Sequence, residues 1–331
     1  MIIGRELTDK ILEKVANRPC VIITDSNVFE LYGGGFSKLP VLSFKAGEAS
    51  KTRETKEKLE DELLKMGCGR DTLLIALGGG VVTDLVGFIA STYMRGISYI
   101  SVPTTLMGMV DAAIGGKTGV NTRAGKNLIG TFYQPEEIFI DLDYLETLPL
   151  KERNEGLTEV IKYGLIRDRR LFELVESSGN LEEMIRRSFK IKMGIVDKDA
   201  KEKGLRQVLN FGHTVGHAIE HLSGYAMSHG DAVFLGLLVE SRISFEMGLL
   251  SEGELNRIFN LREPISFPNF SFEKIWEAMK IDKKNLKQAP HFVLIEEIGK
   301  VYENKSTFSF PIEKELVEKS FNLCRINSAL L

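Results

Sequence analysis

Cysteine is scarce in this chain of 331 residues, with only Cys20, Cys68 and Cys324. They lie far apart, form no CxxC pair and show no metal-ligand spacing, so neither a disulfide framework nor a cysteine metal site is expected. We interpret them as reduced thiols, which favours a cytoplasmic protein. The first fourteen residues carry charge throughout and contain no apolar core, so a signal peptide is not expected.

An excess of basic residues is also lacking, because 43 Lys and Arg face 46 Asp and Glu and the net charge is -3. A nucleic-acid-binding protein normally has a broad basic excess, so nucleic acid is not an expected partner. The longest weakly charged stretch, 72–92, contains glycines and Asp84. It is more typical of a buried strand, turn and helix than of a membrane span.

The length favours two domains, and the pattern changes near residue 150. Strands are predicted at 21–24, 41–44, 72–77, 99–103 and 138–141, with helices at 52–65 and 84–91. This alternation predicts an α/β Rossmann-like domain with a parallel sheet over 1–150. Helices are predicted at 151–168, 171–177, 181–203, 205–222, 231–247 and 252–260. We therefore expect segment 151–331 to form an all-α domain, with a small β-hairpin at 292–302 that turns near Gly299.

Glycines directly follow one predicted strand and open a helix, in the segment from Gly78 to Asp84. Such a turn lets the backbone approach a pyrophosphate, and a tight packing turn is an equally good interpretation. Thr83 stands where the usual dinucleotide motif has its third glycine. The later sequence 115–118, GGKT, is not a phosphate-binding P-loop, because Asp111 occupies the position of the required glycine.

Polar side chains and glycines alternate between residues 111 and 130. Glycine-rich backbone beside a few polar groups suits a ligand-wrapping loop, and a solvated charged loop is the alternative. Glu159 and Lys162 are three residues apart and share one face of a predicted helix. From spacing alone, a surface ion pair is the favoured interpretation of these two residues.

Four of the five histidines fall between residues 213 and 229, and His213, His217 and His221 recur every four residues. That spacing stacks side chains on one face of a helix, and neutral imidazole is the commonest protein ligand of divalent metals. Arg206 and Asn210 extend the same predicted face. The cluster predicts a zinc-type site with three ligands, either three histidines or two with a carboxylate.

Taken together, these segments closely resemble the 3-dehydroquinate synthase family. The matching segments are 25–28, 47–51, 78–84, 93–96, 102–106, 110–118, 125–130, 159–162, 205–206, 210–217, 229–230 and 282–284. The resemblance implies an NAD-binding domain, a helical domain and an active site between them. It also implies a divalent metal, zinc or cobalt, held by Glu159, His213 and His229. His217 would then face the substrate, and His221 would have no assigned role.

The resemblance also implies sets of ligand-binding residues. NAD would contact Asp25, Asn27, Gly47, Glu48, Lys51, Gly79, Gly80, Val81, Asp84, Thr104, Thr105, Asp111, Lys117, Lys126, Tyr144 and Thr147. Substrate would contact Arg95, Asp111, Lys117, Asn127, Lys162, Lys192, Arg206, Asn210, His217 and Lys283 or Lys284. Lys117, Lys162, Asn210 and His217 would act in catalysis.

The implied reaction converts 3-deoxy-D-arabino-heptulosonate 7-phosphate to 3-dehydroquinate and phosphate, a step of aromatic amino acid biosynthesis. It comprises transient oxidation by NAD, β-elimination of phosphate, re-reduction, ring opening and aldol closure. The family further implies a homodimer. The alternatives are another sugar phosphate cyclase, a polyol dehydrogenase of the glycerol dehydrogenase type with net NAD turnover, and a non-catalytic binding protein with the same fold.

Overall fold

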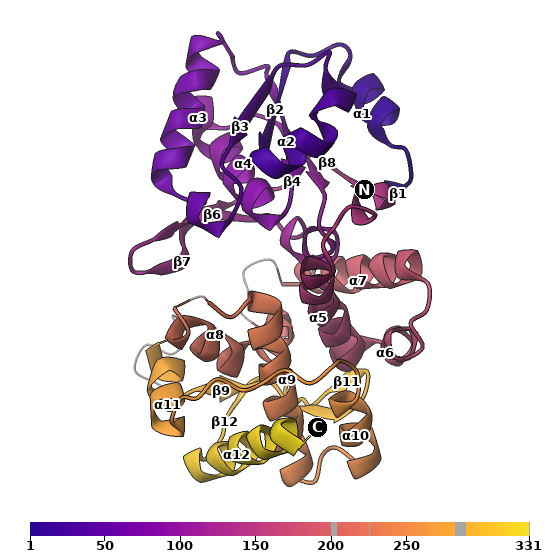
Figure 1. Cartoon of the computed structure of the whole chain (residues 1–331), viewed down its shortest axis with the longest axis vertical. Coiled ribbons are helices and arrows are strands. Elements are labelled where there is room, and N and C mark those ends of the chain that lie inside the picture. Colours follow the sequence, from indigo (N-terminus) through magenta and orange to yellow (C-terminus); the bar gives the residue numbers. More distant parts are fainter. Residues whose placement is uncertain (200–203, 225, 282–288, 331) are drawn as a thin grey trace. The chain divides into compact units, whose positions relative to one another are not determined.

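A computed structural model describes residues 1–331 apart from 200–203, 225, 282–288 and 331. The chain divides into two compact units, Met1–Gly156 and Leu157–Leu331 (Figure 1). The sequence predicts a domain boundary near residue 150, at the start of helix α5, Leu150–Arg167. In the structure the division falls inside that helix, after Gly156. Among the described residues, no helix is both long and apolar enough to cross a membrane.

The first unit is built on a six-stranded sheet of order β1-β8-β5-β4-β2-β3, whose neighbouring strands all run parallel. The strands are β1 Ile2–Gly4, β2 Cys20–Asp25, β3 Val41–Phe44, β4 Leu73–Gly78, β5 Tyr99–Pro103 and β8 Glu137–Asp141. Five were predicted, because continuous apolar runs mark strands that are covered on both faces. Strand β1 was missed, since it is a half-buried edge strand of three residues.

The helices of this unit confirm the predicted α/β alternation. They are α1 Thr8–Val15, α2 Ser26–Tyr32, α3 Arg53–Lys65 and α4 Gly80–Thr92. Helix α3 begins after Thr52, whose hydroxyl accepts a hydrogen bond from the Thr55 amide at 3.1 Å. Helix α4 begins at Gly80, before the predicted Asp84. Its first turn packs tightly, because a Cβ at Gly78 would lie 2.4 Å from Val82 Cγ2.

The glycine-rich segment that was predicted to be a loop is instead an antiparallel hairpin. Strand β6, Lys117–Thr122, pairs with β7, Gly125–Phe132, as Figure 1 shows. Its glycines allow a very close approach of the two strands: a Cβ at Gly130 would lie 1.8 Å from Thr118 O. The loop prediction was therefore wrong, because glycine here serves close packing rather than flexibility.

The second unit is mainly helical, as predicted. Its helices are most of α5, then α6 Arg169–Glu176, α7 Leu181–Val196, α8 His213–Leu222, α9 His229–Glu246, α10 Glu252–Phe259, α11 Phe272–Ile281 and α12 Lys314–Leu330. Helix α9 is buried along most of its length and contacts α8, α10 and α12. The predicted hairpin is present as β10 Ile295–Glu297 and β11 Lys300–Val301, with Gly299 at φ +93°. A second pair joins β9 His291–Phe292 to β12 Phe310–Pro311.

The predicted helix 205–222 is interrupted. Residues Leu205–Asn210 form a 3-10 turn, and α8 begins only after Gly212, whose φ is +79°. The break lets α8 pack closely on α9, since a Cβ at Gly236 would lie 1.9 Å from Gly212 O. Arg206 and Asn210 therefore do not share a helical face with His213, and that prediction was wrong. Helix α7 likewise ends at Val196, short of the predicted residue 203.

Candidate metal centre and nucleotide site

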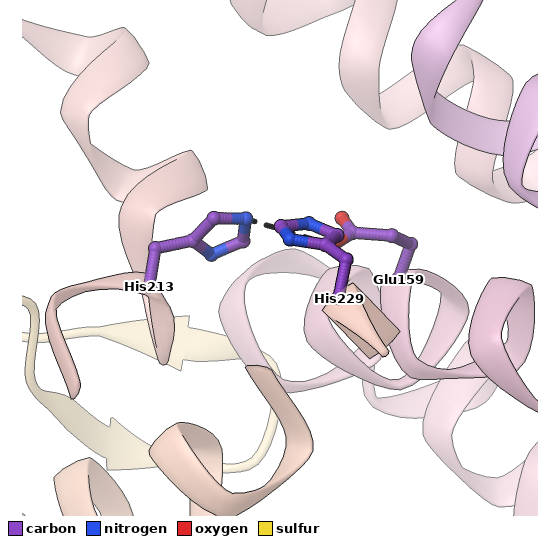
Figure 2. A group of neighbouring side chains, drawn as sticks. All are labelled: Glu159, His213 and His229. Atoms are coloured by element: carbon purple, nitrogen blue, oxygen red, sulfur yellow. Dashed lines mark ion pairs between the residues drawn. The ribbon is translucent and has the colours of Figure 1, made fainter. Parts of the chain in front are cut away.

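Three helices of the second unit bring Glu159, His213 and His229 together (Figure 2). Glu159 projects from α5, and the two histidines are the first residues of α8 and α9. One ligand atom from each lies within 4.8 Å of the others. His213 Nε2 is 3.6 Å from Glu159 Oε1. One carboxylate and two imidazoles are a common ligand set for catalytic zinc.

The chemistry of these groups fits a divalent cation. Glu159 is only 1% exposed, and among the described residues no hydrogen bond reaches its Oε1. Lys162 Nζ forms a buried ion pair with Glu159, which overturns the surface ion pair favoured by spacing alone. Burial, and then the charge of Lys162, hold the pKa of His213 well below its usual value, so the ring is neutral and ready to bind a metal. Its Nδ1 lies 3.1 Å from Phe211 O, which leaves Nε2 for the metal.

The structure separates the histidines that looked equivalent in sequence. His217 stays in the cluster, with its ring centroid 5.2 Å from that of His213 and 5.9 Å from that of His229. His221 is exposed on the far part of α8. His229 joins the cluster from another helix. The three histidines do lie on one helix, as their spacing predicted, but His221 belongs to neither group of candidate metal ligands among the described residues, because it lies two turns along α8 from His213.

Arg262 joins two of the ligand-bearing helices and was missed in the sequence. Its guanidinium donates to Thr158 Oγ1 at 2.7 Å and to Asp231 Oδ1 at 2.9 Å. Thr158 precedes the ligand Glu159, and Asp231 follows His229 by two residues. Arg262 follows α10 in an irregular segment without periodicity, so no pattern in the sequence pointed to it.

A capping signal that marks the start of α9 was present in the sequence. Ser228 Oγ accepts a hydrogen bond from the Asp231 amide at 3.2 Å, directly before His229. A serine three residues before an acidic residue is a typical helix start. The cap places His229 at the first residue of the helix, where its side chain can reach α5 and α8.

Three of the residues expected to bind the substrate are basic side chains buried in the second unit. Lys162, Lys192 and Arg206 are 2%, 6% and 1% exposed. Removing such charges from water is costly unless an opposite charge compensates. Asn210 and His217 are half-buried, whereas Lys283 and Lys284 lie outside the described residues. The buried set is suited to a ligand with several negative charges.

Residues predicted to contact NAD gather at the carboxyl ends of the parallel strands in the first unit. Asp25 ends β2, Gly79 and Gly80 follow β4, and Thr104 follows β5. The order of strands reverses at β2 and β4, and such a switch point is the usual ligand crevice of an open parallel sheet. Asp25 also has a structural part, since its carboxylate accepts the amides of Asn27 and Val28 at the start of α2.

A polar network links the predicted residues of α4, the 3-10 turn Glu48–Ser50 and the hairpin. Lys51 Nζ lies 2.5 Å from Asp84 Oδ2 and 2.6 Å from Asn127 Oδ1. Asn121, missed in the sequence, donates to Glu48 Oε1 at 2.7 Å and accepts from the Asn127 amide at 3.0 Å. The hairpin and the crevice thus share one hydrogen-bonded network.

The remaining predicted residues of this unit lie in several settings. The exposed ones are Asn27, Gly47, Arg95, Lys117 and Thr147, and the half-buried ones are Val81, Thr105 and Lys126. Asp111 lies in the π-helical turn Gly108–Ala112. Tyr144 is buried, with its ring centroid 4.7 Å from that of Tyr32. Burial raises the pKa of Tyr144 well above its usual value, so its hydroxyl stays protonated.

Family models match both halves of the chain. The model of the 3-dehydroquinate synthase N-terminal domain matches residues 41–155, and that of its C-terminal domain matches 156–285. The chain belongs to the 3-dehydroquinate synthase family. A 3-dehydroquinate synthase of Caldanaerobacter subterraneus subsp. tengcongensis is 43% identical over 316 residues, covering 88% of each chain. That of Nitrosospira multiformis is 41% identical over 88% of this chain and 85% of its own.

Solved structures agree with membership of the 3-dehydroquinate synthase family. A 2-epi-5-epi-valiolone synthase from Streptomyces hygroscopicus subsp. jinggangensis, with NAD+ and Zn2+ bound, matches at a TM-score of 0.89 and 28% identity, over 98% of this chain and 96% of its own. A probable glycerol dehydrogenase from Sinorhizobium meliloti matches at 0.63 and 13% identity, over 100% and 97%. At that identity the likeness concerns the fold alone.

Proposed function

We propose that the chain converts 3-deoxy-D-arabino-heptulosonate 7-phosphate to 3-dehydroquinate and phosphate. The observation that carries the proposal is the cluster of Glu159, His213 and His229 beside Lys162, in a chain 43% identical to a 3-dehydroquinate synthase. A carboxylate with two histidines suits metal-assisted chemistry at a hydroxyl group. The buried cations suit a substrate that carries both a carboxylate and a phosphate.

Glu159, His213 and His229 would hold the divalent metal, zinc or cobalt, and the crevice residues of the first unit would hold NAD. When bound, the metal would supply Lewis-acid activation of a substrate hydroxyl, and NAD would supply reversible hydride transfer. Neutral His213 offers a lone pair at pH 7, and Glu159 offers the negative charge. Asp25, Lys51 and Asp84 would contact the nucleotide, together with the amides after β4.

The chain's own residues would bind and orient the substrate. Lys162, Lys192 and Arg206 would pair with its anionic groups, and their burial makes each pairing stronger than in water. Asn210 and His217 would orient the phosphate for departure. Holding a flexible seven-carbon chain in one reactive geometry accounts for a large part of the rate enhancement of such a reaction.

Phosphate release from the heptulosonate phosphate tests this function directly. The purified protein, loaded with NAD and zinc, should release phosphate without sustained accumulation of NADH, and a chelator should stop the release. Net accumulation of NADH from a polyol would instead favour the dehydrogenase. Release from a hexose 6-phosphate but not from the heptulosonate would favour another sugar phosphate cyclase.

Helix α7 offers a matched pair of variants for the anion-binding role. Lys192→Ala removes a buried cation and should lower kcat/KM for phosphate release by at least about tenfold, since one charged contact contributes about 1.5–3 kcal/mol. Lys190→Ala removes an exposed lysine of the same helix and should leave kcat/KM unchanged. Equal effects of the two substitutions would contradict the role of Lys192.

We also propose that the protein is cytoplasmic and forms a homodimer. Family membership supports both, and the three free cysteines, two of them buried, agree with a reducing compartment. Light scattering coupled to size exclusion should give twice the 37.1 kDa of the chain. A monomer at micromolar concentration would contradict the dimer.

Three titratable thiols after denaturation without reductant would support a reducing compartment such as the cytoplasm.

A further inference from the structure

Glu220 is a buried carboxylate that is absent from the metal, NAD and substrate residues implied by the family resemblance. It lies on α8, is 5% exposed, and its Oε2 is 3.2 Å from Nδ1 of His229 at the start of α9. The contact joins the helix that carries His213 and His217 to the helix that carries His229. A buried carboxylate is costly, so its place beside one of the three proposed metal ligands calls for a specific role.

The contact determines which nitrogen of His229 can bind a metal. A neutral imidazole carries one N–H and one lone pair, and an acceptor at Nδ1 places the N–H there and the lone pair on Nε2. His213 shows the same arrangement, with Phe211 O as the acceptor at its Nδ1. Both histidines thus have an acceptor at Nδ1, and Nε2 remains for the metal.

We propose that Glu220 is a positioning residue that orients His229, fixes its tautomer and thereby raises the affinity of the metal centre. The proposal rests on the metal site proposed above. A carboxylate behind a metal-binding histidine also increases the basicity of the ring. Glu220 would act through His229 alone, without touching the metal or the substrate.

The same carboxylate belongs to a competing ligand set. His217, Glu220 and His229 also bring one ligand atom each within 4.8 Å of one another. Glu159 is the better ligand of the two carboxylates. Its Oε2 pairs with Lys162, but its Oε1 is buried, receives no hydrogen bond from the described residues and lies 3.6 Å from His213 Nε2, whereas Glu220 Oε2 already accepts a hydrogen bond from His229. If Glu159 is the ligand, substitution of Glu159 should abolish zinc binding; if Glu220 is the ligand, substitution of Glu220 should do so.

The test measures zinc affinity by competition with a chelating dye, together with the visible spectrum of the cobalt-loaded protein. Glu220→Ala should raise the Kd for zinc about 10–100-fold and alter the cobalt bands. Glu220→Gln should retain most of the affinity, since its amide oxygen still accepts from Nδ1. Glu246→Ala is the control: Glu246 lies on α9 and pairs with Arg242 and Lys319, away from the ligand residues in sequence.

The outcomes separate this inference from the proposed function. A wild-type protein that binds no zinc at one equivalent would overturn the metal site itself. Wild-type binding with an unchanged Kd in Glu220→Ala would overturn only the role of Glu220. Loss of zinc in Glu220→Gln with retention in Glu159→Gln would make Glu220 a ligand and overturn the positioning role.

A variant that retains the carboxylate covers the case in which Glu220→Ala fails to fold. Glu220→Asp draws the carboxylate back by one methylene, so it should weaken zinc binding and shift the cobalt bands. The thermal unfolding of its metal-free form should stay close to that of the wild type. An unchanged Kd and an unchanged spectrum in this variant would overturn the proposal.

Discussion

His213 and Glu159 face each other in the second unit, with 3.6 Å between Nε2 of the imidazole and Oε1 of the carboxylate. They come from α8 and α5, and both are largely removed from water. Burial and the charge of Lys162 keep His213 neutral. Glu159 pairs with Lys162 through Oε2, while no hydrogen bond from the described residues reaches its Oε1. A neutral imidazole nitrogen beside a buried carboxylate oxygen that receives no hydrogen bond is an arrangement that a bound cation would stabilise.

His213→Ala should lose bound zinc and phosphate release together, because one of three ligands is removed. Metal content after gel filtration and the rate of phosphate release measure the two effects. His221→Ala is the matched control, since His221 is exposed on the same helix, and it should retain both. A metal-free His213→Ala protein with full activity would refute the ligand assignment.

Arg262→Met should lower the free energy of unfolding by about 2 kcal/mol and weaken zinc binding. The side chain is 10% exposed, and its loss frees Thr158 and Asp231, which neighbour two ligands. Chemical denaturation of the metal-free protein measures the first effect and dye competition the second.

Arg257→Met is the control for this substitution. Both guanidinium groups lie over an aromatic ring, at 4.9 Å from the Phe234 centroid for Arg262 and at 5.1 Å from the Phe172 centroid for Arg257. The ion pair of Arg257 with Glu176 is more exposed than that of Arg262 with Asp231. Its removal should cost less than about 1 kcal/mol and leave the zinc Kd unchanged. Equal losses of stability and of zinc affinity in the two variants would contradict the proposed role of Arg262, which is to hold α5 and α9 together through Thr158 and Asp231.

The buried Glu240 of α9 should make stability depend on pH. Burial raises its pKa well above the ordinary value of 4.5, although nearby backbone amides, including that of Gly212, oppose the shift. The folded state then retains a proton that the unfolded state loses, so the free energy of unfolding falls as pH rises above about 4.5. Glu240→Gln should remove this part of the pH dependence in denaturation series.

Glu246, on the same helix, should give a pH dependence of stability with the opposite sign to that of Glu240. Hydrogen bonding to Lys319 lowers the pKa of Glu246, so its contribution to stability is lost as pH falls through that lowered value. Glu246→Gln should flatten the acid side of the profile and leave the alkaline side unchanged. Identical profiles for both variants and the wild type would contradict these assignments.

Gly130→Ala should disrupt the hairpin, because its Cβ would lie 1.8 Å from Thr118 O. We expect NAD affinity to fall at least about tenfold, since the hairpin carries Lys117, Lys126 and Asn127, which are all proposed ligand contacts. Titration calorimetry measures this effect. Gly253→Ala in α10 meets no atom within 4 Å and should stabilise that helix by up to about 1 kcal/mol without changing NAD binding.

Much of the α/β unit was predictable, because its central strands are continuous apolar runs and its helices carry capping residues such as Thr52. The hairpin at Lys117–Phe132 was not, since its glycines were interpreted as loop residues. In the structure they permit contact between two backbones that is too close for any side chain. That requirement depends on the partner strand and is not visible within a local window.

The amino-acid pattern alone established the parallel α/β unit, the helical unit and the concentration of histidines, because periodicity and composition act locally. Which histidine lies beside which carboxylate depended on tertiary packing. The break at Gly212 starts α8 at His213, and the cap at Ser228 starts α9 at His229. Packing of those helices with α5 brings Glu159 to both rings and Glu220 behind one of them, since contacts between distant segments follow from helix packing rather than from spacing along the chain.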